Sequence, residues 1–268
     1  MMRSAGGYTI IEVLVVLAVT GALFVSAAIL FNGKQGRTEF SQSMRDFESK
    51  LQTVANEVST GFYVTGFTCK ANGSGQVKVT SPVASEGANE GCIFLGKAVH
   101  SDGDQLDTYT VVGKQYIGSS TDDVVTIDDA KPVAVSQYSS GNSPDVTNTY
   151  QNKWGMKVTA IKEADSNNPI GTFAFISELG GGVGASSPVT GSRGVVLYSI
   201  KNSRMTDSPN SVVGDIERPT LYKVEQEGVK ICVTGANRQI GEIDLGTHDS
   251  QTGTEVLIDE AVSDACKP

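Results

Sequence analysis

An uncharged apolar segment near the amino terminus limits what this chain can fold into. It covers residues 13–31, VLVVLAVTGALFVSAAILF. A helix rises about 1.5 Å per residue, so a segment of this length would cross a hydrocarbon layer of roughly 30 Å. Glu12 lies directly before it and is the only charged residue between Arg3 and Lys34. We therefore expect a membrane-spanning helix whose start carries one carboxylate in need of an explanation.

Two ordinary kinds of amino-terminal segment would match the apolar run. A secretory signal would be cleaved after small residues, and residues 25–28, VSAA, could serve as its cleavage site. A plain signal anchor would remain uncleaved. An acidic residue at the centre of such a helix is unfavourable by about 2.5–3.5 kcal/mol, and the cost is smaller near an end. Neither a signal nor an anchor accounts for Glu12.

A third interpretation does account for Glu12. Residues 7–13 read GYTIIEV, follow a short leader with one basic residue and lead straight into the apolar run. This start resembles that of a type IV pilin or a type II secretion pseudopilin. The resemblance implies that a prepilin peptidase cuts between Gly7 and Tyr8 and methylates the new amino group of Tyr8. Glu12 then becomes the fifth residue of the mature chain, where the family has its glutamate.

The resemblance also implies a partner for Glu12. Ionisable residues within apolar surroundings usually have a partner and a function. In a pilus this partner would be the positively charged amino group of Tyr8 on a neighbouring subunit. Such pairing would set the axial register, because an offset neighbour would leave both charges unpaired. Glu12 is therefore the expected assembly residue.

The helical pattern continues beyond the apolar segment. Apolar residues three or four positions apart form one stripe and stop before Ser59-Thr60-Gly61, a plausible helix end; they are Phe40, Met44, Phe47, Leu51, Val54 and Val58. A coiled-coil seam would have the same spacing, but the stripe is short for one. We expect it to pack on a sheet. The expected divisions are a leader peptide (1–7), a transmembrane and assembly helix (8–33), its amphipathic continuation (34–60) and a β-rich globular head with loop insertions (61–268).

The rest of the chain is typical of short strands. The runs are rich in β-branched and aromatic residues and are bounded by Gly, Asp, Asn or Ser. They cover residues 62–68, 76–80, 92–99, 108–116, 157–161, 172–176, 194–200, 221–224, 229–233, 239–245 and 255–258. Residues 118–152 are expected to be an insertion. The predicted fold class is α+β: a long amino-terminal helix, half transmembrane and half amphipathic, packed on a mainly antiparallel β-sheet head, the lollipop shape of pilins.

Four cysteines, all in the predicted head, permit three disulfide pairings. Their spacing favours Cys69–Cys92 and Cys232–Cys266, and an exported head would meet oxidising conditions. The second bond would attach the carboxyl-terminal tail to a strand, and a carboxyl-terminal disulfide loop is common in the pilin family. A zinc site is the alternative, but no Cys-x-x-Cys pair is present and no histidine is near a cysteine in sequence.

Other candidate sites are weaker. Asp102, Asp104 and Asp107 could supply oxygen ligands to calcium, as in related pseudopilins, although a solvated acidic turn is the simpler reading. No other cofactor or metal is expected. The glycine-rich residues 178–185 match a dinucleotide-binding loop poorly. His100 and His248 lie in no recognisable catalytic motif, so we do not expect an enzyme.

The charge balance and the resemblance together define the expected function. The net charge is −9 without a basic cluster, which argues against a nucleic-acid partner. The resemblance implies a structural subunit of a type IV pilus-like fibre, a minor pilin by its size, or alternatively a type II secretion pseudopilin. From another class, a signal-anchored envelope binding protein or hydrolase is possible.

The same resemblance names partners and a location. The partners would be other pilin subunits, prepilin peptidase, the pilus assembly platform with its ATPase, and the membrane before assembly. The expected location is single-pass in the cytoplasmic (inner) membrane with the head outside the cytoplasm, and later an extracellular or periplasmic fibre.

Overall fold

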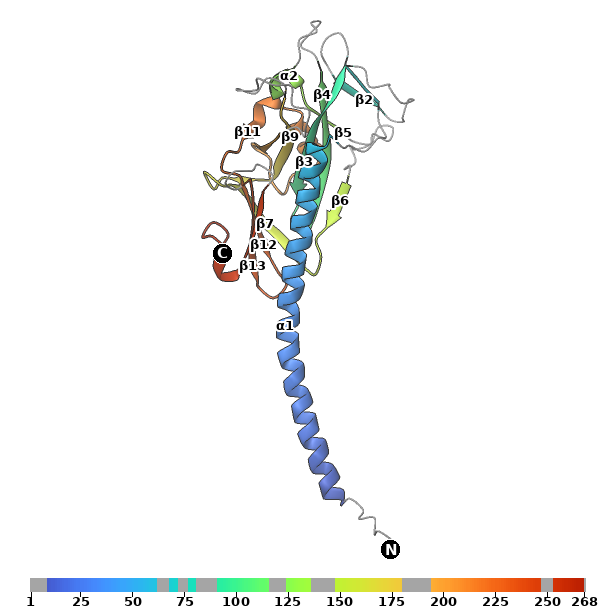
Figure 1. Ribbon diagram of the computed structural model, residues 1–268, viewed down its shortest axis with the longest axis vertical. Helices are drawn as coiled ribbons and strands as arrows, with labels where there is room; N and C mark the ends of the chain where they lie inside the picture. The colour runs from blue at the N-terminus through green and yellow to red at the C-terminus, as the bar shows by residue number, and fades with distance from the viewer. Residues whose placement is uncertain are drawn as a thin grey trace.

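The computed structural model describes residues 9–61, 68–71, 77–80, 91–115, 124–135, 148–179, 194–246 and 253–267. Within residues 27–34 it describes the backbone but not the side chains. Two antiparallel sheets make up most of the described chain after residue 61, and one helix, α1, runs along them and extends beyond them (Figure 1).

Helix α1 covers Ile10–Ser59. Thr9 is its N-cap: the Thr9 hydroxyl accepts a hydrogen bond from the backbone N–H of Glu12, at 3.3 Å. Such a cap satisfies one of the backbone donors that a helix start leaves unpaired. The helix ends at Thr60, and Gly61 has φ +70°, a left-handed conformation that glycine adopts without steric cost.

The larger sheet has seven strands in the order β11-β10-β9-β3-β4-β5, with β6 also paired to β4. These strands are β3 (Cys92–Ser101), β4 (Gln105–Lys114), β5 (Val133–Val135), β6 (Asn148–Gln151), β9 (Thr172–Ser177), β10 (Val195–Ile200) and β11 (Tyr222–Val224). The second sheet has five strands in the order β14-β13-β12-β7-β8. They are β7 (Lys157–Glu163), β8 (Pro169–Ile170), β12 (Val229–Thr234), β13 (Ile240–Leu245) and β14 (Thr254–Ile258).

Smaller elements complete the described chain. A separate hairpin pairs β1 (Thr68–Ala71) with β2 (Val77–Thr80). The short helices are α2 (Ile127–Ala130), α3 (Pro209–Ile216), η1 (Pro219–Leu221) and η2 (Asp259–Ala261).

The centre of the seven-stranded sheet is buried on both faces: every residue of β9 is buried, and its middle four residues are apolar. Phe173 and Phe175 point to a core shared with α1 and the five-stranded sheet. Ala174 and Ile176 point to the opposite core, which the apolar residues of α3 close. A strand covered on both faces reads as a continuous apolar run instead of an alternating one.

The apolar stripe of residues 40–58 lies in the first of these cores. All six residues are between 0% and 3% exposed and pack with residues from both sheets. The prediction that this stripe packs against a sheet, and not in a coiled-coil seam, is confirmed. Burying six large apolar side chains against two sheets fixes the second half of α1 to the head.

Most strand predictions are accurate to within a few residues. From residue 76 onward each predicted strand coincides with an observed one, whereas 62–67 lie outside the described residues. The expected insertion at 118–152 contains β5 and β6, and helix α3 was not predicted. Its signals are a Ser208 N-cap, Pro209 in the first turn, and apolar residues at 212, 213 and 216.

The predicted fold class needs correction in two respects. The head is not one sheet but two antiparallel sheets, and the predicted transmembrane helix is not found among the residues that the structure describes. In the part of the chain that is described, no helix contains a stretch both long and apolar enough to cross a membrane.

The predicted location fails for the same reason. A single-pass position in the cytoplasmic membrane requires a spanning helix, and the described residues do not provide one.

Candidate functional site

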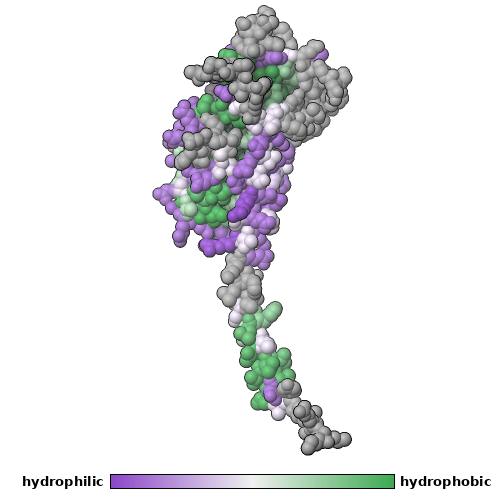
Figure 2. Space-filling model, viewed as in Figure 1, coloured by the Kyte–Doolittle hydropathy of each residue, from purple (hydrophilic) through white to green (hydrophobic). Residues whose placement is uncertain are grey.

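The first half of α1 presents apolar side chains that the head does not cover. They are between 47% and 83% exposed, and Figure 2 shows them along the projecting part of the helix: Ile10, Ile11, Val13, Leu14, Val15, Val16, Leu17, Val19, Leu23, Phe24 and Val25. We call these residues the exposed apolar helix surface. Contiguous exposed apolar surface on this scale marks an interaction site, because it is unfavourable in water.

Glu12 lies at the start of this surface and is exposed. It occupies the first turn of α1, three residues after the N-cap Thr9, which is the position of the acidic residue in a capping box. A carboxylate there also interacts favourably with the positive end of the helix dipole. Glu12 thus stands at a position that favours an acidic residue at a helix start, and its assembly role remains a prediction from the sequence. Gly7 and Tyr8 lie outside the described residues.

Both predicted disulfides are present. Cys69 of β1 is bonded to Cys92 at the start of β3, with Cα atoms 6.1 Å apart. Cys232 of β12 is bonded to Cys266 in the tail, with Cα atoms 5.2 Å apart. The second bond joins the carboxyl-terminal tail to a central strand of the five-stranded sheet.

The tail is also held by polar contacts around that disulfide. The backbone N–H of Ser263 donates to Glu242 Oε2 at 2.7 Å, and Lys162 Nζ donates to the carbonyl oxygen of Ala265 at 2.5 Å. Lys230 pairs with Glu242 at 2.6 Å and with Asp244 at 3.2 Å. Burial and the adjacent Glu242 raise the pKa of Asp244 to about 6.

The predicted calcium candidates do not converge on a common point. Asp102 Oδ1 accepts the backbone N–H groups of Asp104 and Gln105, both at 3.0 Å. Asp104 pairs with Lys157 at 2.8 Å, and Asp107, in β4, accepts from Thr149 at 2.8 Å. Among the described residues no group of three or more acidic, histidine or cysteine side chains could hold a metal ion. The turn is therefore organised by its own hydrogen bonds.

A buried ion cluster, which the sequence did not reveal, joins the two sheets. Glu163, from β7, accepts from Lys223 Nζ at 3.0 Å and from Ser166 Oγ at 2.6 Å through Oε2. Ser199 Oγ lies 3.0 Å from Glu163 Oε1 and 2.6 Å from Glu225 Oε1. No periodic pattern links these residues in sequence, so only pairing of distant strands could bring them together.

The two glutamates of this cluster have pKa values shifted in opposite directions. Burial alone would raise the pKa of Glu163, but hydrogen bonds from Ser166, Lys223, Ser199 and Asn168 lower it to about 2. Burial raises the pKa of Glu225, which is only 1% exposed. Three carboxylates surround Lys223, which holds the pKa of its ammonium above the usual value despite its burial.

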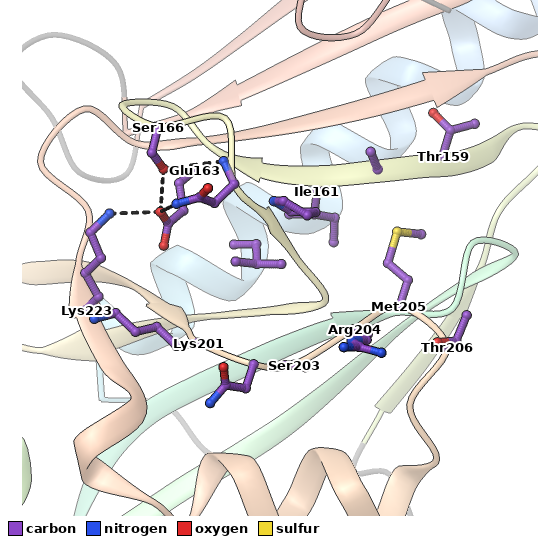
Figure 3. A pocket seen from close by; sticks show the side chains of 15 residues that line it. Thr159, Ile161, Glu163, Ser166, Lys201, Ser203, Arg204, Met205, Thr206 and Lys223 are labelled. Atoms are coloured by element: carbon purple, nitrogen blue, oxygen red, sulfur yellow. Dashed lines mark hydrogen bonds and ion pairs between the residues drawn. The ribbon is translucent and has the colours of Figure 1, made fainter.

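A groove of about 970 Å³ opens next to the ion cluster, between β7–β8 and the loop that follows β10 (Figure 3). Of the apolar residues that line it, Ile161 and Ile170 are buried in the core and Met205 is partly buried. Its basic residues are Lys201, Arg204 and Lys223. In Figure 3 Lys201 and Lys223 lie at one end and Arg204 and Met205 at the other.

His100 lies in a buried row of hydroxyl groups. Its Nδ1 is 3.0 Å from Thr172 Oγ1, which is 2.5 Å from Ser203 Oγ, and all three side chains are at most 2% exposed. Burial lowers the pKa of His100, so the neutral imidazole is favoured. His248 and the glycine-rich residues 180–185 lie outside the described residues.

Comparisons with other proteins give no relative from which a function could be transferred. No protein-family model, no curated protein and no solved structure matches this chain.

Proposed function

We propose that this protein is a structural subunit of a type IV pilus-like fibre, a minor pilin, with a type II secretion pseudopilin as the alternative within the same class. The proposed maturation is cleavage after Gly7 by a prepilin peptidase and methylation of Tyr8. The other proposed partners are further pilin subunits and an assembly platform with its ATPase.

The observation that supports this proposal most is the exposed apolar helix surface. Helix α1 is anchored to the head by its second half, while its first half presents apolar side chains that nothing in the described chain covers. Amino-terminal helices of neighbouring copies bundled together would bury these side chains and remove an unfavourable contact with water. The second half would then present the head outside the bundle.

Glu12 gives the proposal a specific test. In the proposed fibre its carboxylate would pair with the amino group of Tyr8 from an adjacent subunit, and it also occupies the capping-box position that follows the N-cap Thr9. Glutamine can replace glutamate in a capping box but has no charge. Charge pairing and helix capping therefore predict different results for Glu12→Gln.

The experiment compares the incorporation of three variants into sheared fibres. We expect Glu12→Ala and Glu12→Gln both to be lost from fibres at unchanged cellular levels. We expect Thr9→Ala, which removes the cap at a cost of about 1 kcal/mol but retains the charge, to be incorporated. Normal incorporation of Glu12→Gln would contradict charge pairing.

The mature amino terminus tests the maturation step. Mass spectrometry of protein recovered from fibres should find a chain that begins with methylated Tyr8. A chain that begins at Met1, or near residue 28, would contradict processing by a prepilin peptidase.

A further inference from the structure

A turn of the head that is bonded to α1 carries an exposed aromatic side chain, Trp154. Its side chain belongs to a residue that is 44% exposed, and its backbone has φ +49°. We propose that Trp154 packs against the exposed apolar helix surface of another subunit in the fibre. This contact rests on the proposed function, because it requires a second subunit, and it adds a residue of the head to the assembly interface.

The backbone conformation at Trp154 is unfavourable for a bulky residue. Trp154 and Gly155 have φ +49° and +70°. They are the central residues of a turn that is closed by a hydrogen bond from Met156 N to Lys153 O, at 3.0 Å. Where both central residues of a turn have positive φ, asparagine and glycine are preferred, and a large side chain is a steric outlier. Such outliers are concentrated at functional sites, so folding of the turn does not explain this tryptophan.

The turn is held firmly against α1. The hydroxyl of Ser43 donates to the carbonyl oxygen of Lys153 at 3.0 Å, and Lys153 Nζ lies 2.6 Å from Asp46 Oδ2. Ser43 is fully buried, and Met156, directly after the turn, is 2% exposed. Because the backbone on both sides of Trp154 is fixed, its ring loses little conformational freedom when a partner covers it.

Two other large apolar side chains of the described head are exposed to a similar extent, but they lie elsewhere. Val125 and Val224 are 49% and 43% exposed. Val125 precedes α2 and Val224 ends β11, and in Figure 1 both elements lie toward the end of the head that is far from the projecting helix. Among the described residues, Trp154 is therefore the one of these three that flanks α1.

The partner is the surface that the proposed fibre must cover. Helices bundled with α1 lie alongside it, so a side chain that flanks α1 faces the neighbouring helices. Val25 is the last member of the exposed apolar helix surface, and the turn is bonded to Ser43, 18 positions later, which corresponds to about 27 Å of helix. A subunit displaced by that distance toward the head would bring its apolar side chains level with the ring of Trp154, and the contact would remove both from water.

The variant Trp154→Asn separates a contact role from a structural one. Asparagine suits positive φ, so we expect the midpoint of thermal unfolding to rise by about 2–4 °C. We expect incorporation into sheared fibres to fall at least about fivefold, as is usual when an interface tryptophan is truncated. Incorporation like that of the natural protein would overturn the proposal. A variant that is both less stable and poorly incorporated would also overturn it, because the ring would then support the fold.

The matched control is Lys131→Asn. Lys131 has the same φ, +49°, is exposed, and follows α2 at the far end of the head (Figure 1). Its ion pair with Asp128 is exposed and contributes little to stability. We expect this variant to be incorporated like the natural protein. Equal loss of both variants from fibres would mean that the ring of Trp154 is not the cause.

Photo-crosslinking identifies the partner. A phenylalanine that carries a benzophenone replaces Trp154, and adducts recovered from fibres are mapped by mass spectrometry. We expect them on the apolar amino-terminal helix of another subunit, which in a second copy of this chain means residues 10–26. Adducts confined to head residues would overturn the proposal.

The same probe at Leu14 tests the proposed function separately. Leu14 belongs to the exposed apolar helix surface and needs only the helix bundle to form an adduct with another subunit. Adducts from position 14 without adducts from position 154 would leave the fibre in place and exclude the contact of Trp154. The absence of adducts from both positions would contradict the proposed function itself, and this contact with it.

Discussion

Lys223, in the seven-stranded sheet, lies with its Nζ 3.0 Å from Oε2 of Glu163, in the five-stranded sheet. The side chain of Glu163 is 5% exposed and that of Lys223 is 28% exposed. This pair, with Ser199 and Glu225, is one polar connection between the two sheets, which also share an apolar core. The position of each sheet therefore depends partly on one lysine.

Removal of this lysine should destabilise the head. In Lys223→Met the carboxylate of Glu163 stays buried without its cation, and we expect a loss of at least about 2 kcal/mol in the free energy of unfolding. Urea unfolding followed by circular dichroism measures this free energy for the variant and the natural protein. The control Lys153→Met breaks an exposed pair with Asp46 and should cost less than about 1 kcal/mol. Equal losses would contradict a special role for Lys223.

The low pKa of Glu163 predicts a loss of stability in acid. Its folded-state pKa of about 2 is below the unfolded value of 4.5, so the ionised form is favoured in the folded protein. This contribution is present above pH 4.5 and disappears as the pH falls through 2, with a size on the order of 3 kcal/mol. Unfolding measured from pH 7 to pH 2 should show a fall that Glu163→Gln lacks. If the free energy of unfolding falls in parallel with pH for the two proteins, Glu163 is not the source of the acid sensitivity.

Asp244 should have the opposite pH dependence. Its folded-state pKa of about 6 exceeds the unfolded value of 3.8, so its contribution is present below pH 3.8 and is lost as the pH rises through 6. The stability of the natural protein relative to Asp244→Asn should therefore decrease between about pH 4 and pH 7. Asp264→Asn, at a side chain 98% exposed, is the control and should show no such trend.

The tail disulfide should be detectable directly and should stabilise the fold. Peptide mapping without reductant should recover a fragment that links Cys232 to Cys266, and free thiols at both positions would exclude the bond. Replacing both cysteines with serine opens a loop with a sequence separation of 34 residues. The expected loss is about 3–4 kcal/mol on the chain-entropy account.

The apolar stripe should control the attachment of α1. Phe47 is fully buried and packs edge-to-face with Tyr150 at a centroid distance of 6.2 Å. Phe47→Ala should lower the free energy of unfolding by about 3–5 kcal/mol, through lost burial and the cavity left behind. Ser49→Ala, on the exposed face of the same turn, should change it by no more than about 0.5 kcal/mol. A small effect of Phe47→Ala would mean that the helix is held by other contacts.

The amino-terminal apolar run shows the limit of a pattern read without the structure. Its composition predicts a transmembrane helix and a membrane location, and neither is supported by the described residues. Hydrophobic length alone does not separate a segment that crosses a lipid layer from one that is covered by other protein surfaces, because both exclude water in the same way. The exposed apolar helix surface is compatible with the second case, which is the basis of the proposed assembly.

The sequence by itself determined the local features of this protein. The spacing of Phe40 to Val58 gives the buried face of α1, alternating and β-branched runs give the strands, and cysteine spacing gives both disulfides. Each of these features depends on residues that lie within a few dozen positions of one another in the sequence. Only the tertiary structure decided that the strands divide into two sheets, that Lys223 meets Glu163, and that Lys201 and Arg204 border one groove. Residues 60 positions apart meet there because strands pair across the whole head, and no local periodicity encodes that pairing.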